Sequence, residues 1–180
     1  MLRRNSLALA GAGALLPILA QAQSIPPAQQ HTQSGGTPPT TDPNRMRSMA
    51  IEGSTFLLRT AQLGAQRAQN PMLRTFAQLE AEEQQANMQA MQLARLQIPA
   101  QVAASGDKLR QLQQLEQQSG ADFDQLFIQA QMNGHQEALQ IMQRIAQSGA
   151  SEEERIIGTL NVPAIRSHLV MLETIRSMRT

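Results

Sequence analysis

The sequence predicts an all-α protein with four antiparallel helices and a short extra helix in the middle connection. From residue 45 onwards Ala, Gln, Leu, Arg, Glu and Met dominate, and all are good helix formers. β-branched residues are sparse, and no stretch shows the period-two alternation of a strand. Residues that end helices divide this region at Asn70-Pro71, at 98–106, at Ser119-Gly120 and at Ser148-Gly149.

The amino-terminal segment is interpreted as an export signal. Arg3 and Arg4 precede an apolar run at 7–20, and small residues follow up to Ala22. The run is shorter than the roughly 20 apolar residues that cross a bilayer. We therefore expect residues 1–22 to be a signal peptide cleaved after Ala22, which leaves no membrane span. The expected location is the periplasm, with secretion as the alternative, and the adjacent arginines leave the general and twin-arginine routes both open.

Residues 23–44 are predicted to be a disordered tether. They are rich in Pro, Gln, Ser, Thr and Gly and contain almost no large apolar residue. Such a segment buries too little apolar surface to offset the entropy of ordering it. His31, within this segment, is expected to be exposed to solvent. The helical domain then comprises residues 45–180, a length typical of one domain.

Composition argues against several classes of function. Removing Arg3 and Arg4 with the signal leaves 13 basic against 14 acidic residues, a net charge of −1. This balance, with four Phe and no Tyr or Trp, argues against a nucleic-acid partner. The absence of cysteine excludes disulfides and thiolate chemistry. No phosphate-binding Gly-rich loop and no His-Glu-x-x-His motif occurs, so nothing specific indicates an enzyme.

Each long segment carries a stripe of apolar residues at alternating steps of three and four, which predicts its buried face. The first helix ends before Asn70, and its stripe is Met46, Ala50, Gly53, Leu57, Thr60 and Gly64. Pro71 suits the first turn of the second helix. The stripe of the second helix is Met72, Phe76, Leu79, Glu83, Ala86, Ala90 and Leu93.

A short segment at 107–118 precedes the third long helix. The stripe of the third helix is Phe123, Phe127, Ala130, Gly134, Ala138, Ile141 and Ile145, with His135 at its edge. Ser151 and Glu154 form a capping box that opens the fourth helix, and Pro163 is expected to kink it. The stripe of the fourth helix is Ile157, Leu160, Ala164, His168, Met171, Ile175 and Met178. Short loops favour an up-and-down bundle, although the connection at 98–120 is long enough for a crossover.

Glu83 and His168 therefore interrupt two apolar stripes, and His135 borders a third. An unpaired buried carboxylate would cost several kcal/mol, so we expect Glu83 to be paired, neutralised or hydrated. One interpretation is a hydrogen-bonded network with His168 or His135. The other is that Glu83, His135 and His168 bind one ion of Fe, Mn or Zn. Because no Glu-x-x-His pair occurs, spacing alone favours the network.

Four short segments also occur in a specific order. They are Asn70-Pro71-Met72-Leu73-Arg74-Thr75-Phe76-Ala77, then Glu82-Glu83-Gln84, then Ser119-Gly120-Ala121-Asp122-Phe123-Asp124 leading to His135, then Val162-Pro163-Ala164-Ile165-Arg166-Ser167-His168-Leu169. This ordered set resembles the exported bacterial family catalogued as domain of unknown function 4142 (DUF4142). The resemblance covers about residues 46–178. It implies a ferritin-like four-helix bundle, usually periplasmic, whose molecular role is not established.

The chain departs from that family pattern at two places. The resemblance implies an acidic residue where this chain has Leu57, and an Asp-His pair where it has Glu83-Gln84. Glu83, His135 and His168 match the implied ligand set, whereas Leu57 and Gln84 do not. At most three ligand candidates remain, too few for the carboxylate-rich di-metal centre of ferritin-like oxidases.

The predicted function is therefore a non-catalytic binding or stress-related structural role for a periplasmic ferritin-like bundle with a degenerate metal site. The alternative is a single-metal-binding protein that uses Glu83, His135 and His168, and the third hypothesis is a ferritin-like oxidase. The Gln-rich helix faces favour association between helices, so the expected partner is either an unknown protein or a second copy of the chain in a homodimer.

Overall fold

The computed structural model describes residues 42–98 and 102–178, all within one compact unit. The predicted signal peptide, His31 and nearly all of the predicted tether lie outside the described residues. The described residues form helices and contain no strand, which confirms the all-α prediction. The five helices are α1 (Pro43–Arg67), α2 (Pro71–Leu93), α3 (Gly106–Gln117), α4 (Gly120–Ser148) and α5 (Glu152–Ser177). A search of these helices for a stretch that could cross a bilayer found none.

Three of the helices begin at polar side chains that cap them. The Asp42 side chain accepts a hydrogen bond from the N–H of Asn44 at the start of α1. The Asn70 side chain accepts from the N–H groups of Met72 and Leu73, and Pro71 occupies the first turn of α2, where its missing N–H costs nothing. These caps explain why α1 and α2 begin at these residues.

Helix α5 departs from the expected capping box at its start. Ser151 caps it by accepting from the N–H of Glu154, but the Glu154 carboxylate accepts from Ala150 rather than from Ser151. Only half of the predicted capping box therefore forms. The same carboxylate pairs with Arg47 of α1, and it is held in this position by both partners. The helix continues without interruption through Pro163.

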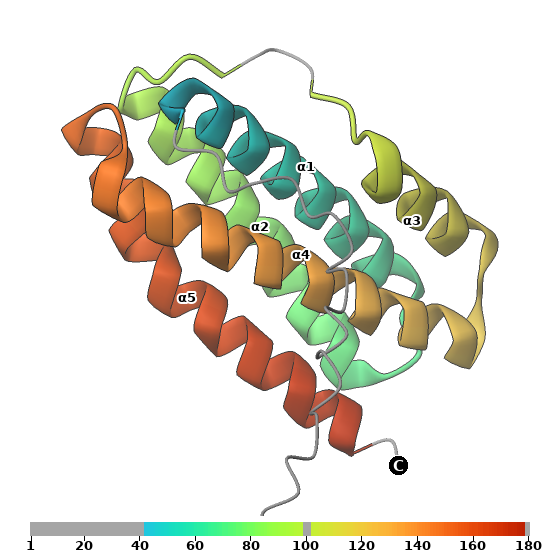
Figure 1. Ribbon diagram of the computed structural model, residues 1–180. Helices are drawn as coiled ribbons and strands as arrows, with labels where there is room; N and C mark the ends of the chain where they lie inside the picture. The colour runs from blue at the N-terminus through green and yellow to red at the C-terminus, as the bar shows by residue number, and fades with distance from the viewer. Residues whose placement is uncertain (1–41, 99–101, 179–180) are drawn as a thin grey trace, which may run out of the picture. The chain divides into compact units, whose positions relative to one another are not determined.

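The four long helices pack side by side in the order α2, α1, α4 and α5, and α5 touches α2 at few places (Figure 1). Figure 1 shows that α1 and α2 run in opposite directions, as do α4 and α5, whereas α2 and α4 run in the same direction. The connection between α2 and α4 therefore crosses the length of the helices, and it contains α3, which packs on α1. The sequence left this crossover open as the alternative to an up-and-down order.

Two apolar clusters fill the interior. The first is built around Phe76, Phe123 and Phe127, and the rings of Phe123 and Phe127 stack with centroids 6.1 Å apart. The second contains Ile141 and Ile165 with neighbouring residues of α1, α4 and α5. Along α4 the last fully buried member of the first cluster is Ala130 and the first fully buried member of the second is Ile141, while the partly buried Ala138 packs against both. Polar side chains occupy the interval between the clusters.

The predicted stripes are correct for two helices and partly wrong for the other two. All predicted positions of α1 are buried, as are those of α4 apart from the partly buried Ala138. In α2 and α5 the structure exposes several residues that we placed inside, namely Met72, Leu79, Ala86, Ala90, Leu93, Leu160, Met171 and Met178. Each of these helices carries a second set of residues at the same spacing that packs inward instead. That set includes Leu73, Ala77, Glu80 and Gln84 in α2, and Asn161, Ile165 and Leu172 in α5.

Candidate metal centre

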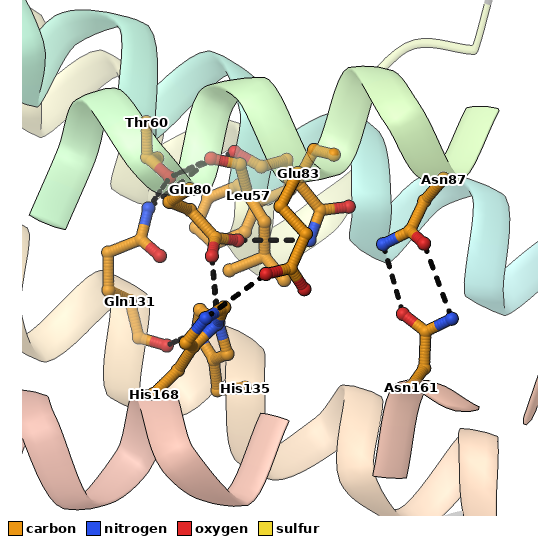
Figure 2. A network of polar contacts seen from close by, with 11 residues as sticks. Leu57, Thr60, Glu80, Glu83, Asn87, Gln131, His135, Asn161 and His168 are labelled. Carbon is orange, nitrogen blue, oxygen red and sulfur yellow. Dashed lines mark hydrogen bonds and ion pairs between the residues drawn. The ribbon is translucent and has the colours of Figure 1, made fainter. Parts of the chain in front are cut away.

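Side chains from three helices converge between the two apolar clusters (Figure 2). They are Glu80 of α2, His135 of α4 and His168 of α5. Oε2 of Glu80 lies 3.0 Å from Nδ1 of His168 and 3.4 Å from Nε2 of His135. The two ring nitrogens are 3.0 Å apart. The side chains of Glu80 and His135 are fully buried, and that of His168 is 15% exposed.

These separations match the geometry of a metal ion with three protein ligands. Two bonds of about 2.1 Å hold their donor atoms about 3.0 Å apart at 90° and about 3.4 Å apart at the tetrahedral angle. The three observed distances, 3.0, 3.0 and 3.4 Å, cover this range. A single ion beside the triangle could therefore contact all three atoms without large movements of the helices.

Nε2 of His135 and Nδ1 of His168, which face Glu80, are the inner ring nitrogens, and the other nitrogen of each ring is the outer one. Each outer nitrogen has its own hydrogen-bond acceptor. Nδ1 of His135 lies 2.8 Å from the carbonyl oxygen of Gln131, one turn earlier in α4. Nε2 of His168 lies 3.3 Å from Oε2 of Glu83. A carbonyl or carboxylate oxygen accepts, so each outer nitrogen carries the hydrogen and donates it. In the neutral ring the inner nitrogen then presents a lone pair, which is how metal-binding histidines are usually oriented.

Glu80 is oriented in the same way. Its Oε1 accepts a hydrogen bond of 2.9 Å from Nε2 of Gln84, one turn later in α2. Its Oε2 is buried and close to both imidazoles, yet it has no aligned hydrogen bond to any described residue. A buried carboxylate oxygen without such a bond is costly. The arrangement thus leaves the inner oxygen of Glu80 available to a cation.

Three inward lone pairs within 3.4 Å of one another repel unless positive charge lies among them. A proton on Nδ1 of His168 supplies that charge in one state. A divalent metal ion would supply it in another. The same geometry thus allows a protonated network and a metal complex, and these two occupants compete for one position.

The electrostatics of the protonated state follow from these contacts. Burial alone would lower the pKa of His168, but contact with the Glu80 and Glu83 carboxylates raises it to about 9. Burial alone would raise the pKa of Glu80, but the contacts and charges of His135 and His168 lower it to about 2. At neutral pH the site therefore holds an anionic Glu80 beside a protonated His168.

The surroundings enclose the centre on one side and open it on another. The Phe76 ring meets His168 edge to face, with centroids 5.6 Å apart, and forms an apolar wall. The Glu83 side chain is 34% exposed, and it lies where α2 meets α5. A pair of amides, Asn87 and Asn161, also bridges these two helices (Figure 2). Solvent can approach the centre at this α2–α5 seam.

Of the residues that the sequence singled out, the structure brings His135 and His168 together and places Glu83 outside them. His135, predicted at the edge of its stripe, is fully buried. Glu83 contacts only the outer nitrogen of His168. The inner carboxylate is Glu80, which the sequence did not indicate because the apolar stripe predicted for α2 lies on the other face of that helix. A stripe through Leu73, Ala77, Glu80 and Gln84 would have found it.

The comparisons with known proteins give a family but no activity. Residues 26–175 match the family described as Domain of unknown function (DUF4142). The chain belongs to the DUF4142 family. No curated protein and no solved structure matches it. The two positions at which the chain departs from the pattern we expected for DUF4142 both adjoin the centre. Gln84 donates to Glu80, and the carbonyl oxygen of Leu57 accepts from Gln131.

Proposed function

We propose that this DUF4142 protein binds one divalent transition-metal ion through Oε2 of Glu80, Nε2 of His135 and Nδ1 of His168. The observation that supports the proposal is the set of three inward-facing atoms within 3.4 Å of one another, each on a side chain that a separate outer partner orients. A second set of residues that orients the ligands is characteristic of metal sites and is not needed for a simple ion pair. Glu83 orients His168 and is not itself a ligand in this proposal.

The donor set suggests which ions bind. Two imidazoles and one carboxylate suit Zn, Fe(II) and Mn, and the three protein ligands leave further positions for water. The crossover between α2 and α4 and the central position of the site support a ferritin-like assignment, which we include in the proposal. The amino-terminal sequence supports export, so we expect the ion to be acquired in the periplasm. The proposed role is metal binding, without an assigned reaction.

The proposal is tested by metal content and affinity in matched variants. The protein is purified without chelator and its metals are measured after dialysis, followed by titration with Zn²⁺ and Mn²⁺. We expect near one ion per chain in the wild type and loss of binding in Glu80→Gln. The control is Glu82→Gln, which removes an exposed carboxylate from the same helix. Equal metal content in Glu80→Gln and the wild type would refute the site.

Glu83→Gln separates the present site from the one that the sequence suggested. If Glu83 only orients His168, we expect the affinity to fall about 10- to 100-fold with one ion still bound at saturation. If Glu83 were a ligand and Glu80 were not, Glu83→Gln would abolish binding and Glu80→Gln would have the milder effect. The order of the two variants therefore decides which carboxylate binds the ion.

The protonated network is the second candidate, and the pairing of Glu80 with His168 favours it. In that case the centre is purely structural. Glu80→Gln would then lower the free energy of unfolding equally with and without added metal. A loss of stability that appears only in metal-loaded protein would instead support the metal site.

A further inference from the structure

Helices α2 and α5 expose large apolar side chains on the outer side of the seam between them. In α2 the exposed fraction is 47% for Met72, 55% for Leu79 and 85% for Leu93. In α5 it is 68% for Leu160 and 64% for Met178. Single exposed apolar residues are normal, but an extended group of them marks an interaction surface.

One exposed stripe of α5 lacks charge over six turns. At steps of three or four from Ile156 to Met178, its exposed residues are Ile156, Leu160, Pro163, Ser167, Met171, Thr174 and Met178. Residues at this spacing share one face of a helix. Arg166 and Glu173, which are also exposed, lie along one edge of this stripe. A solvent-facing helix surface normally carries charged residues across its middle, so this stripe is unusual for a free surface.

The apolar residues of α2 lie level with those of α5. The contacts of Glu83 with His168 and of Asn87 with Asn161 fix the register of these two antiparallel helices. In that register Leu79 is level with Met171. The same register places Met72 beside Met178, and Leu93 beside Ile156. Together these six residues define the α2–α5 face.

The size of the α2–α5 face suits a stable interface. The stripe from Ile156 to Met178 is about 33 Å long at about 1.5 Å per residue. Two helices about 9 Å apart give a width of about 18 Å, hence an area of about 600 Å². Specific interfaces bury about 800 Å² on each partner, so this face supplies most of what one requires.

We propose that a second copy of this chain packs on the α2–α5 face, with the two α5 helices antiparallel about a two-fold axis. Arg166 and Glu173 are seven residues apart, or about two turns, and therefore lie on the same edge of the helix. In a two-fold pair each residue meets its counterpart reciprocally. Arg166 of each copy then lies opposite Glu173 of the other. This charge complementarity of the chain with itself identifies the occupant as a second copy.

The experiment measures the oligomeric state by sedimentation velocity, using protein produced from the full chain, with chelator present so that metal plays no part. We expect a dimer at about 10 µM protein. Leu160→Glu with Met171→Glu adds two charges to the stripe and should yield a monomer. The matched control is Leu109→Glu, which charges an exposed apolar residue of α3. Unchanged helical content by circular dichroism, with cooperative thermal unfolding, shows that the monomeric variant still folds.

A charge swap tests the two-fold arrangement. Arg166→Glu places like charges opposite each other twice, and we expect dimer affinity to fall by about tenfold or more. Adding Glu173→Arg to the same chain should restore it. A wild type that stays monomeric at about 100 µM, or a dimer unaffected by the Leu160 and Met171 variant, would overturn the proposal. Failure of the second charge change to restore the dimer would overturn the antiparallel arrangement.

Discussion

At the scale of single residues, the centre depends on which atom of each side chain already has a polar partner outside the centre. Gln131, Glu83 and Gln84 each hold the outer atom of one inner residue. The inner atoms are thereby turned towards one another, although they repel when His135 and His168 are neutral. Orientation is maintained by contacts within α2 and α4 and by one contact across the α2–α5 seam. A cation is the natural complement of such a site.

The metal-free protein should be most stable in mildly acidic solution. The raised pKa of His168, about 9 against 6.5, contributes stability that is complete below pH 6.5 and is lost as the pH rises through 9. The lowered pKa of Glu80, about 2 against 4.5, contributes stability that is complete above pH 4.5 and is lost as the pH falls through 2. We expect the free energy of unfolding, measured by denaturant with chelator present, to be highest between pH 4.5 and 6.5.

Metal affinity should respond to pH in the opposite direction. A metal on Nδ1 of His168 must displace its proton, so affinity should rise by about tenfold per pH unit from 6.5 to 9. Titration against a competing chelator across this range measures the slope. A metal affinity that does not change with pH over this range would mean that His168 is not a ligand.

At the scale of the helices, the sequence predicted boundaries better than faces. Pro71, Gly120 and Ser151 act within one turn, so each boundary can be recognised locally. The faces of α1 and α4 could also be predicted, because each has one apolar stripe. Helices α2 and α5 each have two such stripes, and only packing against α1 and α4 determines which stripe faces the interior. Glu80 was missed for this reason, since its partners His135 and His168 lie on other helices.

Two glycines should respond oppositely to alanine because of how closely the helices approach. A Cβ at Gly158 of α5 would lie 2.6 Å from the backbone nitrogen of Ala146 and 2.9 Å from the carbonyl oxygen of Met142, both in α4. The backbone of α4 cannot move aside without straining the helix, so Gly158→Ala should lower the free energy of unfolding by about 1–3 kcal/mol. A Cβ at Gly53 of α1 would meet nothing within 4 Å. Gly53→Ala should therefore raise it by about 0.5–1 kcal/mol.

Denaturant unfolding of the two alanine variants checks this pair of expectations. Gly53→Ala acts as the control, because both substitutions add one methyl group within a helix and share the gain in helix propensity. If Gly158→Ala were also stabilising, α4 and α5 would have to separate easily. The tight packing of these two helices would then be a less important source of stability than the structure indicates.

At the scale of the whole molecule, the helices form two hairpins that are joined mainly by the packing of α1 on α4. Helices α1 and α2 pack together, α4 and α5 pack together, and α1 packs on α4. Helices α2 and α5 touch at few places, largely through the polar contacts of His168 and Asn161. The candidate ligands come from α2, α4 and α5. A bound ion would therefore connect the two hairpins on the side where they are joined least.

This connection predicts where metal binding stabilises the protein. At a free metal concentration about 100 times the Kd, the free energy of unfolding should rise by about 2.7 kcal/mol. Local opening of α2 away from α5 should be suppressed as well. Hydrogen exchange with and without Zn²⁺ should then show the strongest added protection at the amides near Glu80 and His168, and the least in α3. Glu80→Gln should abolish the difference. Equal added protection in all five helices would instead mean that the ion opposes only global unfolding and that the two hairpins already open together.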